Sequence, residues 1–208
     1  KADGRIFKVT YGKTRPAPVN LAALGDADLV KLHLHPNQWH VRHARRLLQE
    51  RASAGKLDPA ALEELRKLAR DADRVPTRLD AIWTLHATGN LDEAARRQLL
   101  SDDSEYVRGW AVRLEWEDRA APEASFAEML KLAQDDPSPM VRLELAAALQ
   151  RMPDAQRLPL ALALVAHAED ANDQNLPLMI WYGIEPLAAA DYKQAVRLIA
   201  AGQISLVL

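Results

Sequence analysis

The sequence predicts an all-α fold, a right-handed α–α superhelix in which about five helix pairs stack side by side behind a short extended N-terminal segment. Ala and Leu dominate the 208 residues, and after residue 20 the apolar positions recur every three or four residues. Val107-Arg108 and Val141-Arg142 each open a helical segment after an acidic turn, and the two arginines lie 34 residues apart. Repetition at this spacing is typical of a solenoid, whose neighbouring repeats bury each other's apolar faces.

The first 19 residues are expected to lie outside the helical repeats. Residues 5–11 alternate apolar with polar side chains and are followed by Gly12, which predicts a strand. Pro16 and Pro18 predict an extended linker, because proline fixes φ and biases the preceding residue away from the helix. Residues 20–208 then form the repeat domain.

Each repeat is expected to consist of a helix, a turn and a second helix. The predicted first helices run from Asp26 to His35, Pro59 to Ala72, Leu91 to Leu100, Pro122 to Gln134 and Ala155 to Ala168. The predicted second helices start near Val41-Arg42, Thr77-Arg78, Val107-Arg108, Val141-Arg142 and Asn175. A sixth pair begins at Asp191, and we expect the chain to stop inside it.

The predicted helix boundaries carry their own chemistry. Side-chain caps are expected from Asn37, Asp58, Asn90 and Asp154, first-turn prolines from Pro59, Pro122 and Pro177, and C-terminal glycines from Gly55 and Gly89. Pro186 is expected to kink or end the fifth second helix.

Composition and charge exclude several classes of function. With Cys absent, Cys-ligated zinc, Fe–S clusters and covalently attached c-type haem are excluded from this segment, and no cofactor is expected in it. The formal net charge of −2 argues against a nucleic-acid partner. The longest apolar run, from Leu158 to Ala168, falls short of the roughly 20 residues that cross a bilayer, so no direct membrane insertion is expected.

No catalytic constellation emerges from the sequence. There is no Gly-x-Ser-x-Gly elbow and no glycine-rich phosphate loop. Four histidines cluster at His33, His35, His40 and His43, of which His40 and His43 could share a helix face. They lack the carboxylates or cysteines of an established zinc spacing, so they are weak candidates and no metal site is predicted.

The tryptophans are the more informative candidates, because all five fall on second helices. The candidate binding residues on this face are Trp83, His86, Arg113, Trp116, Trp181, Tyr182 and Glu185. Trp116 lies about 180° around its helix from Val107, which predicts a surface position. Aromatic and Arg side chains anchor partners well, so an aromatic groove is one interpretation. Packing between repeats is the other, and the more usual role of such indoles.

The acidic turns resemble the signature of HEAT repeats. The segment from Asp136 to Arg142 carries this resemblance, and Asp102 to Arg108 keeps the same separation of six residues. In that family the acid and the arginine form a ladder between neighbouring repeats, which implies a role for Asp102, Arg108, Asp136 and Arg142. Leu176-Pro177 stands where Val-Arg would follow, so the ladder is expected to break there.

A narrower resemblance comes from three strings. The segment Gly4–Val9 resembles the closing strand of a β-propeller, and Leu34–Leu48 and Met179–Leu187 are similar to the helical middle of bacterial, planctomycete-type membrane-bound dehydrogenases. The resemblance implies a sorbosone or glucose dehydrogenase-like propeller before this chain, a cytochrome c-like haem domain after it, and export to the periplasm or cell envelope. Residues 1–19 would then be the end of a propeller strand plus a linker.

These observations predict a non-catalytic interaction and spacer module whose partners are the neighbouring domains or another protein. One alternative is a concave groove that binds a peptide or a carbohydrate. Another is a HEAT-type DNA glycosylase that uses tryptophans together with Asp80. The oligomeric state stays open.

Overall fold

A computed structural model describes residue 9, residues 11–12 and residues 19–204, and it confirms the all-α solenoid. The first helices of the five pairs are α1 (Asp26–Lys31), α3 (Pro59–Asp71), α5 (Glu93–Leu99), α7 (Glu123–Asp135) and α9 (Asp154–Leu164). The second helices are α2 (Gln38–Ser53), α4 (Val75–Ala87), α6 (Glu105–Glu115), α8 (Pro139–Leu149) and α10 (Leu176–Ala190). A further helix, α11 (Tyr192–Ala201), follows, and three short 3₁₀ helices are η1 (Leu21–Ala23), η2 (Leu32–Leu34) and η3 (Ala168–Asn172).

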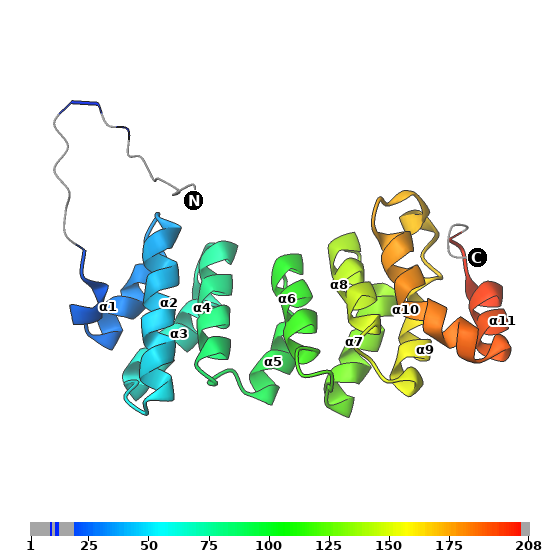
Figure 1. Cartoon of the computed structure of the whole chain (residues 1–208), viewed down its shortest axis with the longest axis horizontal. Helices are drawn as coiled ribbons and strands as arrows, with labels where there is room; N and C mark the ends of the chain where they lie inside the picture. The colour runs from blue at the N-terminus through cyan, green and yellow to red at the C-terminus, as the bar shows by residue number, and fades with distance from the viewer. Residues whose placement is uncertain (1–8, 10, 13–18, 205–208) are drawn as a thin grey trace, which may run out of the picture.

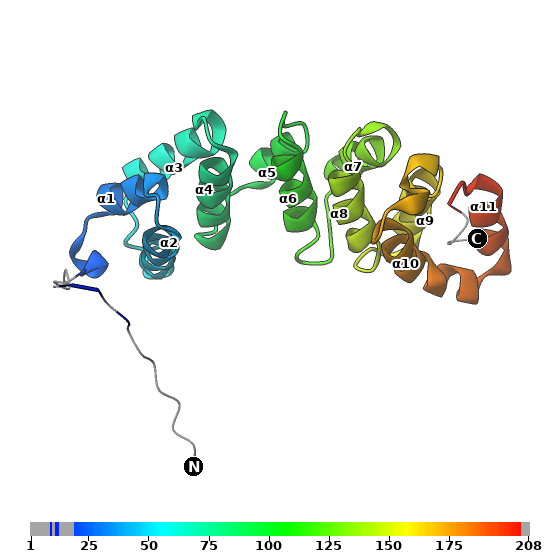
Figure 2. The ribbon, with the colours of Figure 1, turned by 90° about the horizontal axis from the view of Figure 1, so that it is seen from above.

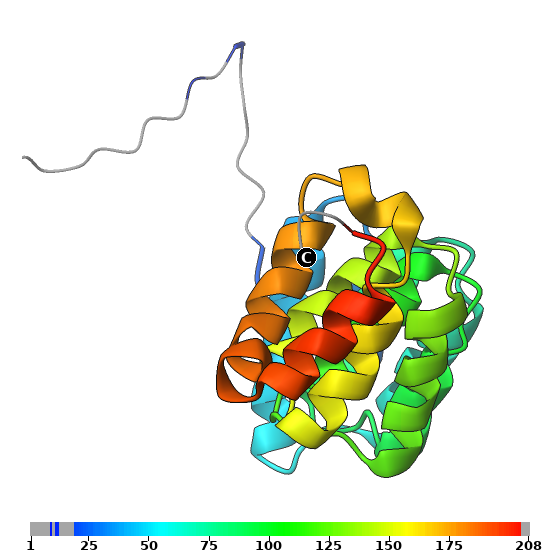
Figure 3. The ribbon, with the colours of Figure 1, turned by 90° about the vertical axis from the view of Figure 1, so that its right-hand side faces the viewer.

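The helices stand in a single row from α1 at one end to α11 at the other (Figure 1). First helices pack on first helices, except between α3 and α5, and second helices pack on second helices, so the row has two layers (Figure 3). Seen from above, the row forms a shallow arch with the second helices on its inner side (Figure 2). We call this side the inner face. The helix α11 packs against α9 and α10 in the position of a sixth first helix.

The expected strand over residues 5–11 and the linker up to residue 19 fall almost entirely outside the described residues. The part of the chain that the structure describes contains no strand.

Local chemistry explains most of the helix ends. The side chains of Asn37 and Asp58 accept hydrogen bonds from the backbone N–H groups of the first turns of α2 and α3, and Gly55 and Gly89 adopt φ of 65° and 71° after their helices. Two predicted caps were wrong. Asp92 rather than Asn90 caps α5, and Asp154 lies inside the first turn of α9.

Pro186 lies inside α10 without ending it. The helix continues for four residues to Ala190, and its last part is turned relative to its first part (Figure 1). Proline lacks the N–H that would bond to the preceding turn, so this bend has a local cause.

Two hydrophobic clusters share the interior of the row. One joins α1 to α5 with one side of α6, and the other joins the opposite side of α6 to the helices as far as α11. The helix α6 packs more extensively on α8 than on α4, so the two clusters meet at a comparatively open junction between α4 and α6. We call this the α4–α6 junction.

Two glycines allow second helices to approach closely in the cluster that extends from α6 to α11, which we call the C-terminal cluster. A Cβ atom added at Gly183 of α10 would lie 2.5 Å from the Cβ of Leu149 on α8. At Gly109 of α6 it would lie 2.9 Å from the Sδ of Met140 on α8. Close contact between these backbones therefore depends on the missing side chains.

Candidate functional site

An arginine–aspartate ladder runs along the turns that lead into the second helices. Arg108 donates from Nε and Nη2 to Asp136 at 2.7 and 2.9 Å, and Arg142 donates likewise to Asp170 at 2.6 and 2.5 Å. Arg78 forms the preceding step with Asp102. Each step joins one repeat to the next, because donor and acceptor lie 24 to 28 residues apart.

Two of the ladder aspartates, Asp136 and Asp102, also fix their own turns. The Oδ1 of Asp136 accepts from the backbone N–H of Ser138, while its backbone carbonyl accepts from Arg142. Asp102 bonds to Ser104 and Arg108 in the same manner. Hydrogen bonding to Asp136 raises the pKa of Arg108, and hydrogen bonding to Asp170 raises that of Arg142. The ladder therefore has a structural role.

The acceptor Asp170 is a ladder residue that the sequence reasoning missed. It lies in η3, just beyond the segment that was predicted to be helical. Its separation of 28 residues from Arg142 equals that between Arg108 and Asp136, and this spacing could have identified it. The ladder stops there, since Leu176-Pro177 supplies no further arginine.

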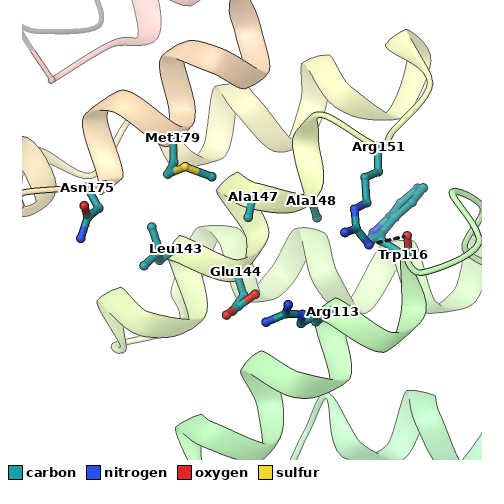
Figure 4. Close-up of a pocket in the computed structure, with 9 residues that line it drawn as sticks. All are labelled: Arg113, Trp116, Leu143, Glu144, Ala147, Ala148, Arg151, Asn175 and Met179. Atoms are coloured by element: carbon teal, nitrogen blue, oxygen red, sulfur yellow. Dashed lines mark hydrogen bonds between the residues drawn. The ribbon is translucent and has the colours of Figure 1, made fainter. Parts of the chain in front are cut away.

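The surface position predicted for Trp116 was wrong. Its side chain is fully buried in the C-terminal cluster, at the C-cap position of α6. The prediction assumed one buried stripe on α6, containing Val107. In the structure α6 is buried on two sides, because Val107 belongs to one cluster while Val112 and Trp116 belong to the other. A position opposite the first stripe therefore faces the next repeat, and Trp116 forms part of the buried wall of the hollow in Figure 4 rather than an exposed contact.

Two tryptophans and two arginines form a continuous stack across the inner face. The guanidinium of Arg45 on α2 lies 5.1 Å from the ring centre of Trp83 on α4. Trp83 meets Trp110 of α6 edge to face at 4.8 Å, and Arg113 lies 4.9 Å from the Trp110 ring. Cation–π contacts stabilise each arginine on its neighbouring indole, and the edge-to-face contact stabilises the pair of indoles. The stack crosses the α4–α6 junction and leaves both indoles half-buried.

The other predicted groove residues occupy two separate places. His86 on α4 hydrogen-bonds to Glu117 after α6, beside the stack. Trp181, Tyr182 and Glu185 are all exposed on α10, with 37% of Trp181 and 53% of Tyr182 accessible. The predicted set is therefore split between the stack and α10, rather than joined in one groove.

A hollow of about 350 Å³ lies between these two places (Figure 4). Arg113 and Arg151 lie on one side of it, and Leu143 and Met179 lie across from them. Glu144 of α8 points into the hollow toward Arg113. Burial raises the pKa of Glu144, and the two arginines oppose this effect.

The four histidines near α2 do not form a metal centre. His33 is buried and bonds to the Val30 carbonyl and the Thr84 hydroxyl at 3.0 and 2.8 Å. His35 lies against His40 with ring centres 4.1 Å apart, and Trp39 stacks on His43 at 4.3 Å. Over residues 19–204 no three His, Cys, Asp or Glu side chains gather to hold a metal ion.

Asp80, the acid considered for a glycosylase, is held inside the fold. Its carboxylate accepts from Arg45 at 2.6 Å and from Gln38 at 2.9 Å, and its side chain is only 3% exposed. Both contacts tie α2 to α4. The carboxylate is thus engaged in packing between the first two repeats.

Comparison with protein-family models finds no match, and comparison with curated protein sequences finds no similar protein. Among the described helices, none combines the length and the apolar character that a bilayer crossing requires. Chemically, the inner face offers cationic, aromatic and apolar groups, which together suit the binding of another molecule.

Proposed function

We propose that this chain is a non-catalytic interaction and spacer module, which holds two partners at a fixed separation. The observation that carries this proposal is the ladder. The same buried ion pair recurs at successive repeats, from Arg78–Asp102 to Arg142–Asp170, and ties them into one row. Buried and geometrically fixed polar contacts of this kind favour one arrangement of neighbouring repeats.

The ends of the row support contact with other domains. Leu34 and Trp39 are 61% and 47% exposed near one end, and Tyr192, Val196 and Ile199 are exposed along α11 at the other. Large exposed apolar side chains on a folded domain favour a partner surface.

The resemblance of Leu34–Leu48 and Met179–Leu187 to the helical middle of membrane-bound dehydrogenases gives this proposal a context. In that context the partners are a propeller and a cytochrome c-like domain of one exported polypeptide, located in the periplasm or cell envelope. The chain would contribute spacing, and the other domains would contribute the chemistry and the haem.

The spacer role is tested by measuring the distance between the two ends. Because the chain has no cysteine, Lys56→Cys and Lys193→Cys give two unique exposed sites for spin labels. We expect one narrow distribution centred at roughly 40 Å, since neighbouring helices stack about 8–10 Å apart. Double electron–electron resonance provides the measurement. A broad or strongly shortened distribution would contradict a spacer.

A second candidate function is the binding of a peptide or carbohydrate on α10, favoured by the exposure of Trp181 and Tyr182. Candidate ligands are titrated while intrinsic tryptophan fluorescence is recorded. We expect Trp181→Ala to weaken binding about tenfold or more without changing the melting temperature. Tyr192→Ala on α11 is the matched control. Equal binding by Trp181→Ala and the parent chain would remove this candidate.

A further inference from the structure

Three arginines gather around one end of the hollow on the inner face. Arg113, Arg119 and Arg151 line a recess of about 340 Å³ together with Trp110 and Glu117. This recess shares Arg113 and Arg151 with the hollow of Figure 4, so the two adjoin, and we treat them together as one depression. We call it the arginine recess.

The three arginines differ from those that stabilise the fold. Arg78, Arg108 and Arg142 are each bonded to an aspartate of the next repeat. Among the ion pairs between described residues, none involves Arg113, Arg119 or Arg151, and all three side chains are exposed. Their guanidinium groups are therefore not committed to a direct ion pair with the fold, although Glu144 lies beside Arg113.

Contacts with the fold position the side chains of Arg113 and Arg151 and the backbone of Arg119. Arg113 lies over the Trp110 ring, and Arg151 donates from Nη1 to the Trp116 carbonyl at 3.3 Å. Arg119 has φ of 60°, an uncommon value for a residue with a side chain, and its backbone N–H bonds to the same carbonyl at 3.2 Å. Side chains that are held in advance lose less conformational entropy when a ligand binds.

Acidic neighbours limit the size of the anion that fits. Glu117 lines the recess and is bonded to His86, and Glu144 lines the adjoining hollow beside Arg113. A continuous polyanion such as a nucleic-acid backbone would meet both carboxylates. A single carboxylate would meet the arginine fork, whose planar donors match its two oxygens.

The adjoining hollow adds an apolar requirement. Leu143 and Ala147 of α8 and Met179 of α10 line it a short way from the arginines. Methionine adapts to varied apolar shapes, which suits a peptide side chain. The depression thus offers a charged pocket and an apolar pocket next to each other.

We propose that the arginine recess binds an acidic peptide segment, whose carboxylate lies between Arg113, Arg119 and Arg151 while a neighbouring apolar side chain enters the hollow beside Met179. The proposal names a ligand class for the interaction role above. It requires peptide binding on the inner face, and it does not require that the chain act as a spacer.

The test uses a displayed library of random twelve-residue peptides, selected on the immobilised chain. We expect the recovered peptides to be enriched in Asp or Glu next to a large apolar residue. A synthetic peptide of the most enriched sequence is then measured by calorimetry. Arg113→Gln and Arg151→Gln are each expected to weaken it about tenfold, because each removes a charge-assisted hydrogen bond.

Two further variants separate specific recognition from general charge. Glu144→Gln removes a competing carboxylate and is expected to tighten binding severalfold. Arg197→Gln, an exposed residue of α11, makes the same charge change far from the recess and is expected to leave binding unchanged. Circular dichroism melts check that every variant folds.

The outcomes are distinct. Peptides that bind equally well to the arginine variants, or that show no acidic enrichment, would overturn the carboxylate proposal while leaving a peptide groove standing. If the selection recovered no peptide at all, the recess would be overturned as a peptide site. Stronger retention of a short DNA duplex than of any acidic peptide, or competition by millimolar inorganic phosphate alone, would assign the recess to another anion and overturn the proposal.

Discussion

At the scale of single residues, Glu115 is the least satisfied charge in the interior. Its side chain is fully buried, its nearest cation is Arg96 with Nε 3.5 Å from Oε1, and neither carboxylate oxygen has a hydrogen-bond partner among the described residues. Burial is the main cause that raises the pKa of Glu115 above the ordinary value of 4.5. The folded chain therefore holds the proton of Glu115 to a higher pH than the unfolded chain does.

This difference predicts how stability depends on pH. The contribution of Glu115 is most favourable below pH 4.5 and is lost as the pH rises through the higher pKa of the folded state. Glu115→Gln removes the titration, so its free energy of unfolding relative to the parent should rise by on the order of 1 kcal/mol between pH 4 and pH 8. Urea unfolding at several pH values provides the measurement. Glu64→Gln, on the exposed face of α3, controls for loss of a surface carboxylate, and a parallel pH trend in both variants would contradict the assignment.

Residue-level predictions from the sequence succeeded where the chemistry is local. Asn37 and Asp58 cap the helices that follow them because a cap needs only the next two or three backbone N–H groups. The surface position predicted for Trp116 was wrong because its burial depends on a neighbouring repeat, which the periodicity of one helix does not reveal. Asp170 was missed because the ladder crosses between repeats at a spacing that only the pairing geometry makes meaningful.

At the scale of helices, the approach of α8 to α10 depends on Gly183. Alanine has the better helix propensity, by about 1 kcal/mol, but its Cβ would lie 2.5 Å from Leu149. Overpacking in a close contact costs about 1–3 kcal/mol, so Gly183→Ala should destabilise the fold by a net amount of up to about 2 kcal/mol. Urea unfolding at pH 7 measures the loss.

Gly109→Ala is the matched variant for this prediction. Its new Cβ would meet the Sδ of Met140, at the flexible end of a side chain that can move away. We expect this variant to be close to neutral. Equal losses at the two glycines would contradict this prediction, because they would show that the mobility of the facing side chain does not decide the cost of the added Cβ.

Helix positions were predictable to within a few residues, because the spacing of apolar residues and the capping residues can be read from the sequence itself. The helix α3, for example, spans Pro59–Asp71, and the prediction was Pro59 to Ala72. Which helices pack closely against each other was harder to predict from the sequence. Neither Gly109 nor Gly183 carries a turn signal, and only the stacked structure shows why each position lacks a side chain. The arginine recess is similar, since Arg113, Arg119 and Arg151 come from two repeats and meet only after stacking.

At the scale of the whole molecule, the α4–α6 junction divides the row into two hydrophobic clusters. The contacts that cross it include the Trp83–Trp110 pair and the ion pair between Arg78 and Asp102. In a repeat protein, stability is the sum of the repeats and their interfaces, so a weakened interface lowers the cooperativity of the array. The large indoles therefore compensate for a junction at which the helices pack less extensively.

Trp110→Ala tests this coupling. Removing the indole should lower the free energy of unfolding by about 2–3 kcal/mol, less than for a fully buried tryptophan because Trp110 is half-buried. It should also broaden the urea transition or split it in two, since α1–α4 and α6–α11 could then open separately. Hydrogen exchange would locate the earlier opening on one side of the junction. Trp181→Ala, which removes an exposed indole of α10 far from the junction, should leave a single sharp transition. A transition for Trp110→Ala as sharp as that of the parent chain would contradict the coupling. It would show that the ladder alone holds the two halves together and that the aromatic stack does not stabilise the junction.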